Sequence, residues 1–394
     1  MAAILEFDHV RYAYPNCPDS LTGVTFSIRK GAKVAVVGPN GAGKTTLLLM
    51  CNGILQPTEG RVLLEGNPLR YDTRTLREVR KKIGFVFQNS DTQLFAPTVY
   101  QDVAFGPVNL GMSPDDVKKN VTEALQAVGL SGYERRLPHQ LSSGEKKRAA
   151  IAGTLAMKPD VLVFDEPTSS LDPAGASDLM ELLDELNAQG KTVIISTHDV
   201  ELAYHWADDI ILMNRGAVLR AGSPEEIFTN PSLITTSNLR MPSLVEVYIE
   251  LLHRQMVEKT AMPKSVLHLV NSLEQSFNRH DRHQQKGTIT VCNVDCTDID
   301  DIRFWIAQHP SSRLGAMGTR AKTLAECESI ALDFTYGVID KCILRALIGE
   351  SSLIMTTGAM VQRVERRVQD YGEEAGVSIS LLLMGGTQGL SREG

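Results

Sequence analysis

One short motif limits what this chain can fold into more than any other feature. Residues 38–45 read Gly-Pro-Asn-Gly-Ala-Gly-Lys-Thr, and they follow the apolar run Val34–Val37. This order predicts a buried strand, a glycine-rich turn and a helix that begins near Lys44, with backbone N–H groups of the turn facing phosphate oxygens. We expect Lys44 to reach the β- and γ-phosphates of a nucleotide and the Thr45 hydroxyl to bind Mg²⁺. The residues expected around the nucleotide phosphates are Gly38, Pro39, Asn40, Gly41, Ala42, Gly43, Lys44, Thr45 and Thr46.

Two further apolar runs end in polar residues that suit the chemistry of a bound nucleotide. Val161–Phe164 is followed by Asp165 and Glu166, and Val193–Ile195 is followed by Ser-Thr-His-Asp, in which the histidine is His198. Asp165 is expected close to the Mg²⁺, and Glu166 is expected to polarise a water molecule in line with the γ-phosphate. His198 is expected to contact the γ-phosphate, although a lone histidine after a strand is more often structural.

The length of the chain and its pattern of apolar residues indicate the number of domains, and its net charge limits the kinds of partner. The chain has 394 residues, whereas an ordinary domain has ~100–200. The pattern predicts an α/β domain with a helical subdomain over residues 1–235, a helical linker with dimer contacts over 236–281, and a small additional α/β domain over 282–394. The formal net charge of −7 argues against nucleic acid as the main partner, because proteins that bind it are usually basic.

The segment Leu141–Arg148 reads Leu-Ser-Ser-Gly-Glu-Lys-Lys-Arg and lies shortly before the Asp-Glu pair. It resembles the signature of ABC-transporter ATPases, usually LSGGQ. The resemblance covers roughly residues 4–250 and implies the P-loop ABC ATPase fold, ATP and Mg²⁺ as ligands, and hydrolysis in a dimer. Ser142 and Gly144 are expected at a helix N-terminus, where they would make a second anion site. In that family this site closes on the γ-phosphate held by the opposite subunit. The residues that match the signature here are Ser142, Ser143, Gly144 and Glu145.

Three other motifs of the family occur in the same order. Tyr14 matches the aromatic residue that stacks on adenine, and Ser170–Asp172 resembles the loop that links the two sites of the dimer. Gln88 matches the glutamine that contacts Mg²⁺ and the attacking water and senses the membrane partner. The resemblance therefore implies the catalytic residues Glu166, His198, Gln88 and Lys44, and the Mg²⁺ ligands Thr45, Gln88 and Asp165.

The signature departs from LSGGQ at two positions. Ser143 replaces a glycine, which adds a side chain in an expected tight turn and predicts some loss of contact with the γ-phosphate. Glu145 replaces the glutamine, as in the version that is found in cobalt- and nickel-type importers. Because Glu166 and His198 are both present, a hydrolysing ATPase is expected.

Residues 91–107 resemble the segment after the glutamine in energy-coupling factor importers, which take up transition metals or vitamins. The segment is expected to form a groove for a helix of a transmembrane coupling subunit, with Leu94, Phe95 and Pro97 exposed, although each is about as often a core residue. With Glu145, it favours import of cobalt or nickel, which a separate substrate-binding membrane subunit would select. The alternatives are the ATPase of a vitamin importer and a soluble ABC-type mechanical switch on ribosomes or DNA.

The expected location follows from what the sequence lacks and from the resemblance. No apolar run reaches the ~18–20 residues of a transmembrane helix, and the N-terminus shows no secretory signal. The six cysteines form no disulfide framework, which is typical of a reducing compartment. We therefore expect a peripheral protein at the cytoplasmic face of the cell membrane, paired with a second ATPase copy that is either identical or a paralogue.

The C-terminal stretch extends beyond the resemblance, and three roles are open for it. The first is a transition-metal site. Its candidate ligands lie close together in sequence: His280, His283, Cys292 and Cys296. Cysteines on a strand are also ordinary core residues, and the histidines stand among charged residues like solvated surface. The second is a regulatory domain for a small ligand, in which the turn at Ser351–Gly358 holds an anion. The third is reinforcement of the dimer.

Overall fold

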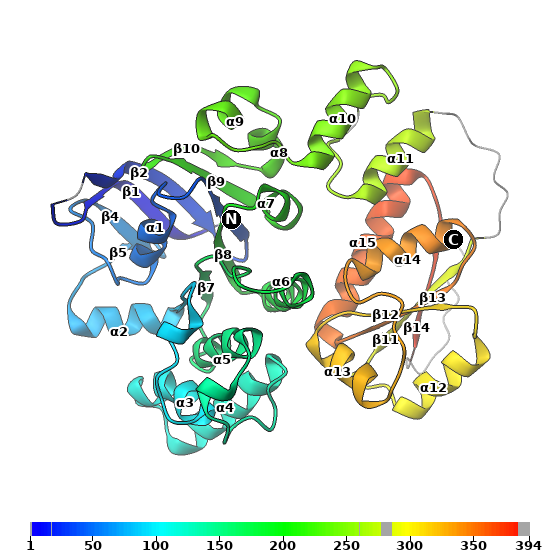
Figure 1. The fold of residues 1–394 in the computed structure, drawn as a ribbon, viewed down its shortest axis with the longest axis horizontal. Helices are drawn as coiled ribbons and strands as arrows, with labels where there is room; N and C mark the ends of the chain where they lie inside the picture. The colour runs from blue at the N-terminus through cyan, green and yellow to red at the C-terminus, as the bar shows by residue number, and fades with distance from the viewer. Residues whose placement is uncertain (1, 17, 260, 277–285, 385–394) are drawn as a thin grey trace. The chain divides into compact units, whose positions relative to one another are not determined.

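The computed structural model describes residues 2–16, 18–259, 261–276 and 286–384 (Figure 1). Contacts divide the chain into two units. The first unit comprises Met1–Leu179, Gln189–Arg254 and Ala261–Ser265. The second comprises Met180–Ala188, Gln255–Thr260 and Val266–Gly394.

The first unit contains two β-sheets. The smaller sheet is antiparallel and has the order β2-β1-β4-β5. Its strands are β1 (Ala3–Ala13), β2 (Asp19–Arg29), β4 (Glu59–Leu64) and β5 (Asn67–Pro68). The larger sheet has the order β10-β9-β3-β8-β7-β6, and all neighbours are parallel except β9 and β10. Its strands are β3 (Lys33–Val37), β6 (Ile83–Val86), β7 (Val161–Phe164), β8 (Thr192–Thr197), β9 (Asp209–Asn214) and β10 (Ala217–Gly222).

The apolar runs of the sequence form the centre of the larger sheet. Every residue of β6, β7 and β8 is buried, as expected for parallel strands that are covered on both faces. Because β3, β8, β7 and β6 are neighbours and run parallel, their carboxyl ends meet at one edge of the sheet. The segments that follow these four strands carry most of the candidate site residues.

The helices of the first unit connect and cover the two sheets. They are α1 (Lys44–Cys51), α2 (Thr73–Lys82), η1 (Ser90–Thr92), α3 (Val99–Asn109), α4 (Pro114–Ala127), η2 (Pro138–Gln140), α5 (Ser143–Leu155), α6 (Pro173–Ala188, whose second half falls in the second unit), α7 (Val200–Trp206), α8 (Pro224–Phe228), α9 (Pro231–Ser237) and α10 (Ser243–His253). Helices α3, α4 and α5 pack on one another and form the helical subdomain (Figure 1). The break that the sequence predicts near residues 131–138 separates α4 from α5.

The second unit contains a parallel sheet with the order β12-β13-β11-β14. Its strands are β11 (Thr288–Asn293), β12 (Arg313–Ala316), β13 (Ser352–Thr356) and β14 (Ser380–Met384). Helices α11 (Val266–Ser276), α14 (Val338–Leu347) and α15 (Gly358–Ala375) share one hydrophobic core with this sheet, and α12 (Ile299–Gln308) and α13 (Thr319–Cys327) share another. The two units agree with the expected architecture, an α/β domain with a helical subdomain followed by a small α/β domain.

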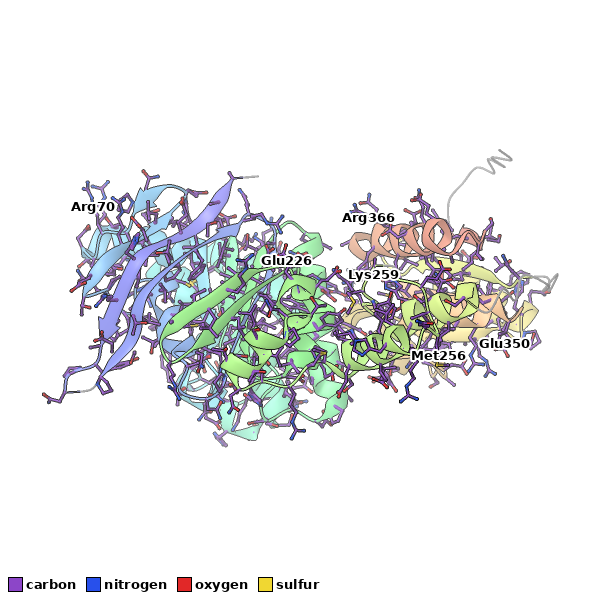
Figure 2. The ribbon with its side chains drawn as sticks, turned by 90° about the horizontal axis from the view of Figure 1, so that it is seen from above. Arg70, Glu226, Met256, Lys259, Glu350 and Arg366 are labelled. Carbon is purple, nitrogen blue, oxygen red and sulfur yellow. The ribbon has the colours of Figure 1, made fainter. Side chains whose placement is uncertain are left out.

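Of the predictions for the second unit, the buried face of α15 is confirmed, whereas the predicted start of the last strand is wrong. Val364, Val368 and Tyr371 are buried on one face of α15, as their spacing predicts, and Figure 2 shows Arg366 on the outer face of the helix. The predicted strand with alternating apolar residues starts later than expected, at Ser380, and its Leu383 is 54% exposed because β14 is the edge strand. None of the helices in the described ranges is long and apolar enough to cross a membrane.

Candidate active site

The turn between β3 and α1 has a backbone that requires glycine. Gly43, the residue before α1, has a φ of 96°, and a Cβ there would lie 2.6 Å from the Ser20 carbonyl oxygen. Beside the start of α1, the Tyr14 hydroxyl lies 3.3 Å from the Thr46 hydroxyl, and Tyr14 is 36% exposed. The aromatic ring therefore lies next to the turn and is accessible to a planar base.

The Lys44 ammonium is buried inside the turn. Its Nζ donates to the carbonyl oxygens of Gly38 at 2.7 Å and of Pro39 at 3.1 Å. Burial lowers the pKa of Lys44, and the carboxylates of Glu166 and Asp165 oppose that shift. A buried cation whose hydrogen bonds go to carbonyl oxygens suits an anion that enters the turn.

Oxygen ligands meet at the ends of α1, β7 and β8. The Thr45 hydroxyl donates to Asp165 Oδ2 at 2.8 Å, and the Ser196 hydroxyl donates to Asp165 Oδ1 at 2.6 Å. The Ser196 oxygen also accepts the Glu166 backbone N–H at 2.9 Å. Carboxylate and hydroxyl oxygens are the ligands that Mg²⁺ prefers, so Thr45 and Asp165 fit this ion. No role for Ser196 was predicted; the available signal was a hydroxyl within the last residues of an otherwise apolar strand.

Gln88 and His198 both contact the Glu166 carboxylate. Gln88 Nε2 donates to Glu166 Oε2 at 3.3 Å, and His198 Nδ1 lies 3.2 Å from Glu166 Oε1. Glu166 has a φ of 43°, a left-handed conformation that costs a non-glycine residue about 1–3 kcal/mol. The hydrogen bond from its N–H to Ser196 helps to hold this conformation. The structure therefore brings together residues from the ends of β6, β7 and β8 around one carboxylate.

The signature residues form the beginning of α5. The Ser142 hydroxyl caps the helix by accepting the Glu145 N–H at 3.3 Å, and the Glu145 carboxylate accepts the Ser142 N–H at 2.7 Å and the Tyr133 hydroxyl at 2.9 Å. The expected tight turn at Ser143 is wrong: this residue is the first of the helix and is exposed, so its side chain fits without strain. Among the described residues, no hydrogen bond joins residues 142–145 to the glycine-rich turn.

A groove of about 390 Å³ lies beside the segment after Gln88. It is lined by Asp91, Leu94, Phe95, Ala96, Pro97, Leu137, Pro138, His139 and Lys146. Phe95 is 65% exposed and its ring lies edge-on to Phe105, with the centroids 4.8 Å apart. The buried carboxylate of Asp102 holds the loop by accepting the N–H groups of Phe95 and Ala96, both at 3.1 Å. Pro97 is exposed as expected, whereas Leu94 is half-buried.

The candidate sites of the C-terminal stretch receive little support. His280 and His283 lie outside the described residues. Within the described part, Cys292 is fully buried and Cys296 is exposed, and no group of three or more His, Cys, Asp or Glu side chains is placed to hold a metal ion. Burial also raises the pKa of the Cys292 thiol, which disfavours the thiolate that a metal needs.

The turn after β13 already holds a carboxylate of its own chain. The Gly358 N–H at the start of α15 donates to Asp295 Oδ2 at 2.8 Å. Asp295 Oδ1 forms an ion pair with Arg320 at 2.7 Å. An anionic ligand at this helix terminus would have to displace Asp295 from both contacts.

Curated relatives match the chain over different lengths. A sequence model described as ABC transporter matches residues 21–169. The energy-coupling factor transporter ATP-binding protein EcfA2 of Methanospirillum hungatei is 49% identical over 381 residues, which cover 96% of each chain. The energy-coupling factor transporter ATP-binding protein EcfA of Methanococcus maripaludis is 52% identical over 253 residues, which cover 64% of this chain and 91% of that relative.

Solved structures agree with these relatives. The structure of cbiO1 from Clostridium perfringens, part of the ABC transporter complex cbiONQ, is 40% identical and has a TM-score of 0.55; the match covers 63% of this chain and 100% of cbiO1. The ATP-binding cassette MJ0796, solved as a dimer in a post-hydrolysis state with ADP and Pi, is 30% identical with a TM-score of 0.51; it covers 56% of this chain and 98% of MJ0796. The chain therefore belongs to the ATP-binding proteins of energy-coupling factor transporters and is an ABC-type ATPase.

Proposed function

We propose that this ATPase energises the import of cobalt or nickel through a separate membrane complex, and that Glu166 is the residue that activates water for hydrolysis. The observation that carries the assignment of Glu166 is the pair of contacts to its carboxylate, from Gln88 at 3.3 Å and from His198 at 3.2 Å. A carboxylate that is oriented by two neighbours from adjacent strand ends is suited to accept a proton from a water molecule held between them.

The remaining residues of the proposed site bind the nucleotide and its charge. Tyr14 would stack on adenine, and the backbone N–H groups of residues 38–46 would hold the phosphates together with the Lys44 ammonium. Mg²⁺ bound by Thr45, Asp165 and Gln88 would neutralise charge on the phosphate oxygens. Ser196 would orient Asp165 for this ion, because its hydroxyl donates to the carboxylate oxygen that Thr45 does not contact.

The signature supports a site that is shared by two subunits. Ser142, Ser143, Gly144 and Glu145 lie at the exposed or half-buried start of α5, and a Cβ on Gly144 would meet only the Leu171 side chain, at 3.9 Å. This open helix terminus is suited to the γ-phosphate of an ATP molecule bound by a second ATPase subunit, since helix N-termini attract anions. The working unit is therefore a dimer of this chain with a copy or a paralogue.

The groove beside Phe95 is the proposed docking surface for a transmembrane coupling subunit. Phe95 and Pro97 are exposed although Asp102 holds the loop in place, so a helix from the partner can cover them without rearrangement of the backbone. Such docking would locate the chain at the cytoplasmic face of the cell membrane, where a further membrane subunit selects the substrate.

The likeness to cbiO1 of the cbiONQ complex and the glutamate at position 145 support cobalt or nickel as the substrate. The second candidate is a vitamin, because the relatives are named for energy-coupling factor transporters in general. A soluble switch on ribosomes or DNA has no support from these relatives.

Uptake of radioactive cobalt and nickel tests the substrate. The full-length chain is reconstituted with its membrane subunits in lipid vesicles that contain Mg·ATP on the side of the ATPase. The proposal predicts ATP-dependent uptake of one of the two metals and its loss in the Glu166→Gln variant. ATP hydrolysis without uptake of either metal would rule out these substrates and make vitamins the next class to test.

A further inference from the structure

Lys147 is a buried lysine that the proposed site does not use. It lies on α5, five residues after Ser142, and it is 3% exposed. Its Nζ donates to the carbonyl oxygens of Phe87 and Gln88, both at 3.0 Å. It forms no ion pair within the described part of the chain. Its two hydrogen-bond acceptors thus belong to the segment that carries the glutamine beside Glu166.

The buried environment of Lys147 is unfavourable for a charged side chain. Burial lowers the pKa of Lys147 to about 8, and only the carboxylate of Asp165 opposes this shift. A buried ammonium without a carboxylate partner is costly, and an apolar side chain of similar length would occupy the same volume at a lower cost. Because burying this charge costs free energy, we expect the ammonium to have a role, and the carbonyl oxygens that it binds indicate that role.

The contact fixes the backbone from which Gln88 reaches the site. The Gln88 carbonyl oxygen is held by Lys147, while the Gln88 side chain donates to Glu166 at 3.3 Å. A second clamp acts on the neighbouring residue: Gln93 Oε1 accepts the Phe87 N–H at 3.0 Å, and Gln93 Nε2 lies 3.4 Å from the Ala150 carbonyl oxygen on α5. Hydrogen bonds from Lys147 and through Gln93 therefore hold the start of this segment to α5.

We propose that Lys147 is a positioning residue that couples the signature helix α5 to Gln88, so that a movement of Ser142 changes the position of the glutamine beside Glu166. The coupling runs through the Lys147 hydrogen bonds to the Phe87 and Gln88 carbonyl oxygens. It rests on the roles proposed above for Gln88 and Glu166. In the dimer, closure of the signature on ATP would thereby bring Gln88 into place for hydrolysis.

A double-mutant cycle on the full-length ATPase tests the coupling. Lys147→Met retains the length of the side chain and removes the hydrogen-bond donors. It is expected to lower kcat about 10-fold, because Gln88 is no longer held in position. The KM for ATP is expected to change less than about 2-fold, because the nucleotide-binding turn is untouched. In a Gln88→Ala background, the same substitution is expected to lower kcat less than about 2-fold further, because the residue through which Lys147 acts is gone.

Stability and a matched control separate positioning from folding. Lys147→Met removes the cost of burying the ammonium, so it is expected to keep or raise the midpoint of thermal unfolding. Lys158→Met is the control, because Lys158 is an exposed lysine just past the end of α5 that pairs with Glu123 at 3.1 Å; its kcat should stay within about 2-fold. Lys147→Gln, which retains a donor without the charge, is the second variant if Lys147→Met fails to fold, and it should give an intermediate kcat.

Different experimental results would overturn the coupling and the proposed function. Equal losses from Lys147→Met with and without Gln88, an unchanged kcat, or a raised KM at constant kcat would each overturn the coupling. Normal turnover of Glu166→Gln would instead overturn the assignment of the base, and the cycle between Lys147 and Gln88 would still report whether they are coupled.

Discussion

At Glu166, hydrogen bonds hold both the side chain and the backbone of a single residue. Gln88 and His198 hold its carboxylate, and Ser196 accepts its backbone N–H while it also donates to Asp165. These contacts fix Glu166 from several sides and so offset the cost of its strained φ. Ser196 thus connects the proposed base to the proposed Mg²⁺ ligand.

Ser196→Ala tests this connection with a small change in volume. The substitution leaves the Glu166 N–H and one Asp165 oxygen without a partner, so we expect the free energy of unfolding to fall by about 1–3 kcal/mol. We also expect the Mg²⁺ concentration for half-maximal ATPase activity to rise about 10-fold, because Asp165 loses the group that orients it. Denaturant unfolding and a Mg²⁺ titration of the ATPase rate measure the two effects. An unchanged Mg²⁺ requirement would contradict the role of Ser196.

Residues whose neighbours in the sequence determine their position were predictable, and residues whose partners are distant were not. Asp165 and Glu166 directly follow an apolar run, so the parallel sheet places them at its carboxyl edge. Lys147, in contrast, hydrogen-bonds to carbonyl oxygens 59 and 60 residues away, and nothing near it in the sequence indicates this contact. Ser196 likewise reaches Asp165 across 31 residues.

At the scale of the element, the start of α5 shows why a glutamate suits the signature of this chain. Glu145 is the third residue of the helix and completes a capping box with Ser142. The Ser142 N–H above all, and then the Tyr133 hydroxyl, hold the pKa of Glu145 below its ordinary value of 4.5. The predicted helix N-terminus at Ser142 is confirmed, whereas the predicted tight turn at Ser143 is wrong, because the cap allows the helix to begin at that residue.

Glu145→Gln tests the capping box through its pH dependence. A carboxylate whose pKa is lowered by folding stabilises the native state above its unfolded pKa, and this contribution is lost as the pH falls through the folded pKa. At neutral pH we expect the variant to be less stable by about 1 kcal/mol, and we expect the difference from the unsubstituted chain to shrink as the pH falls below 4.5, the ordinary pKa of a glutamate. Urea unfolding at a series of pH values gives the result. A difference that stays constant down to acid pH would contradict the ionic role of Glu145.

At the scale of the whole molecule, the relatives differ in how much of the chain they match. EcfA2 of Methanospirillum hungatei covers 96% of this chain, so the match extends over most of the second unit, whereas EcfA of Methanococcus maripaludis covers 64%. The strands of this unit were predictable where they are buried on both faces, as in β11, and poorly bounded at the edge strand β14, where half of the pattern is absent. Three roles stayed open for it, because its His and Cys residues and the turn at Ser351–Gly358 are each also compatible with an ordinary structural role.

The hydrolysis of ATP by the Glu166→Gln variant, followed together with the oligomeric state of the chain, tests the central claim most directly. Glu123→Gln, at an exposed glutamate on α4, is the matched control. With Mg·ATP, the account predicts that Glu166→Gln hydrolyses ATP at least about 100-fold more slowly and accumulates as an ATP-bound dimer in light scattering, while the control turns over normally and returns to its resting state. Normal turnover by Glu166→Gln without accumulation of the dimer would contradict the account.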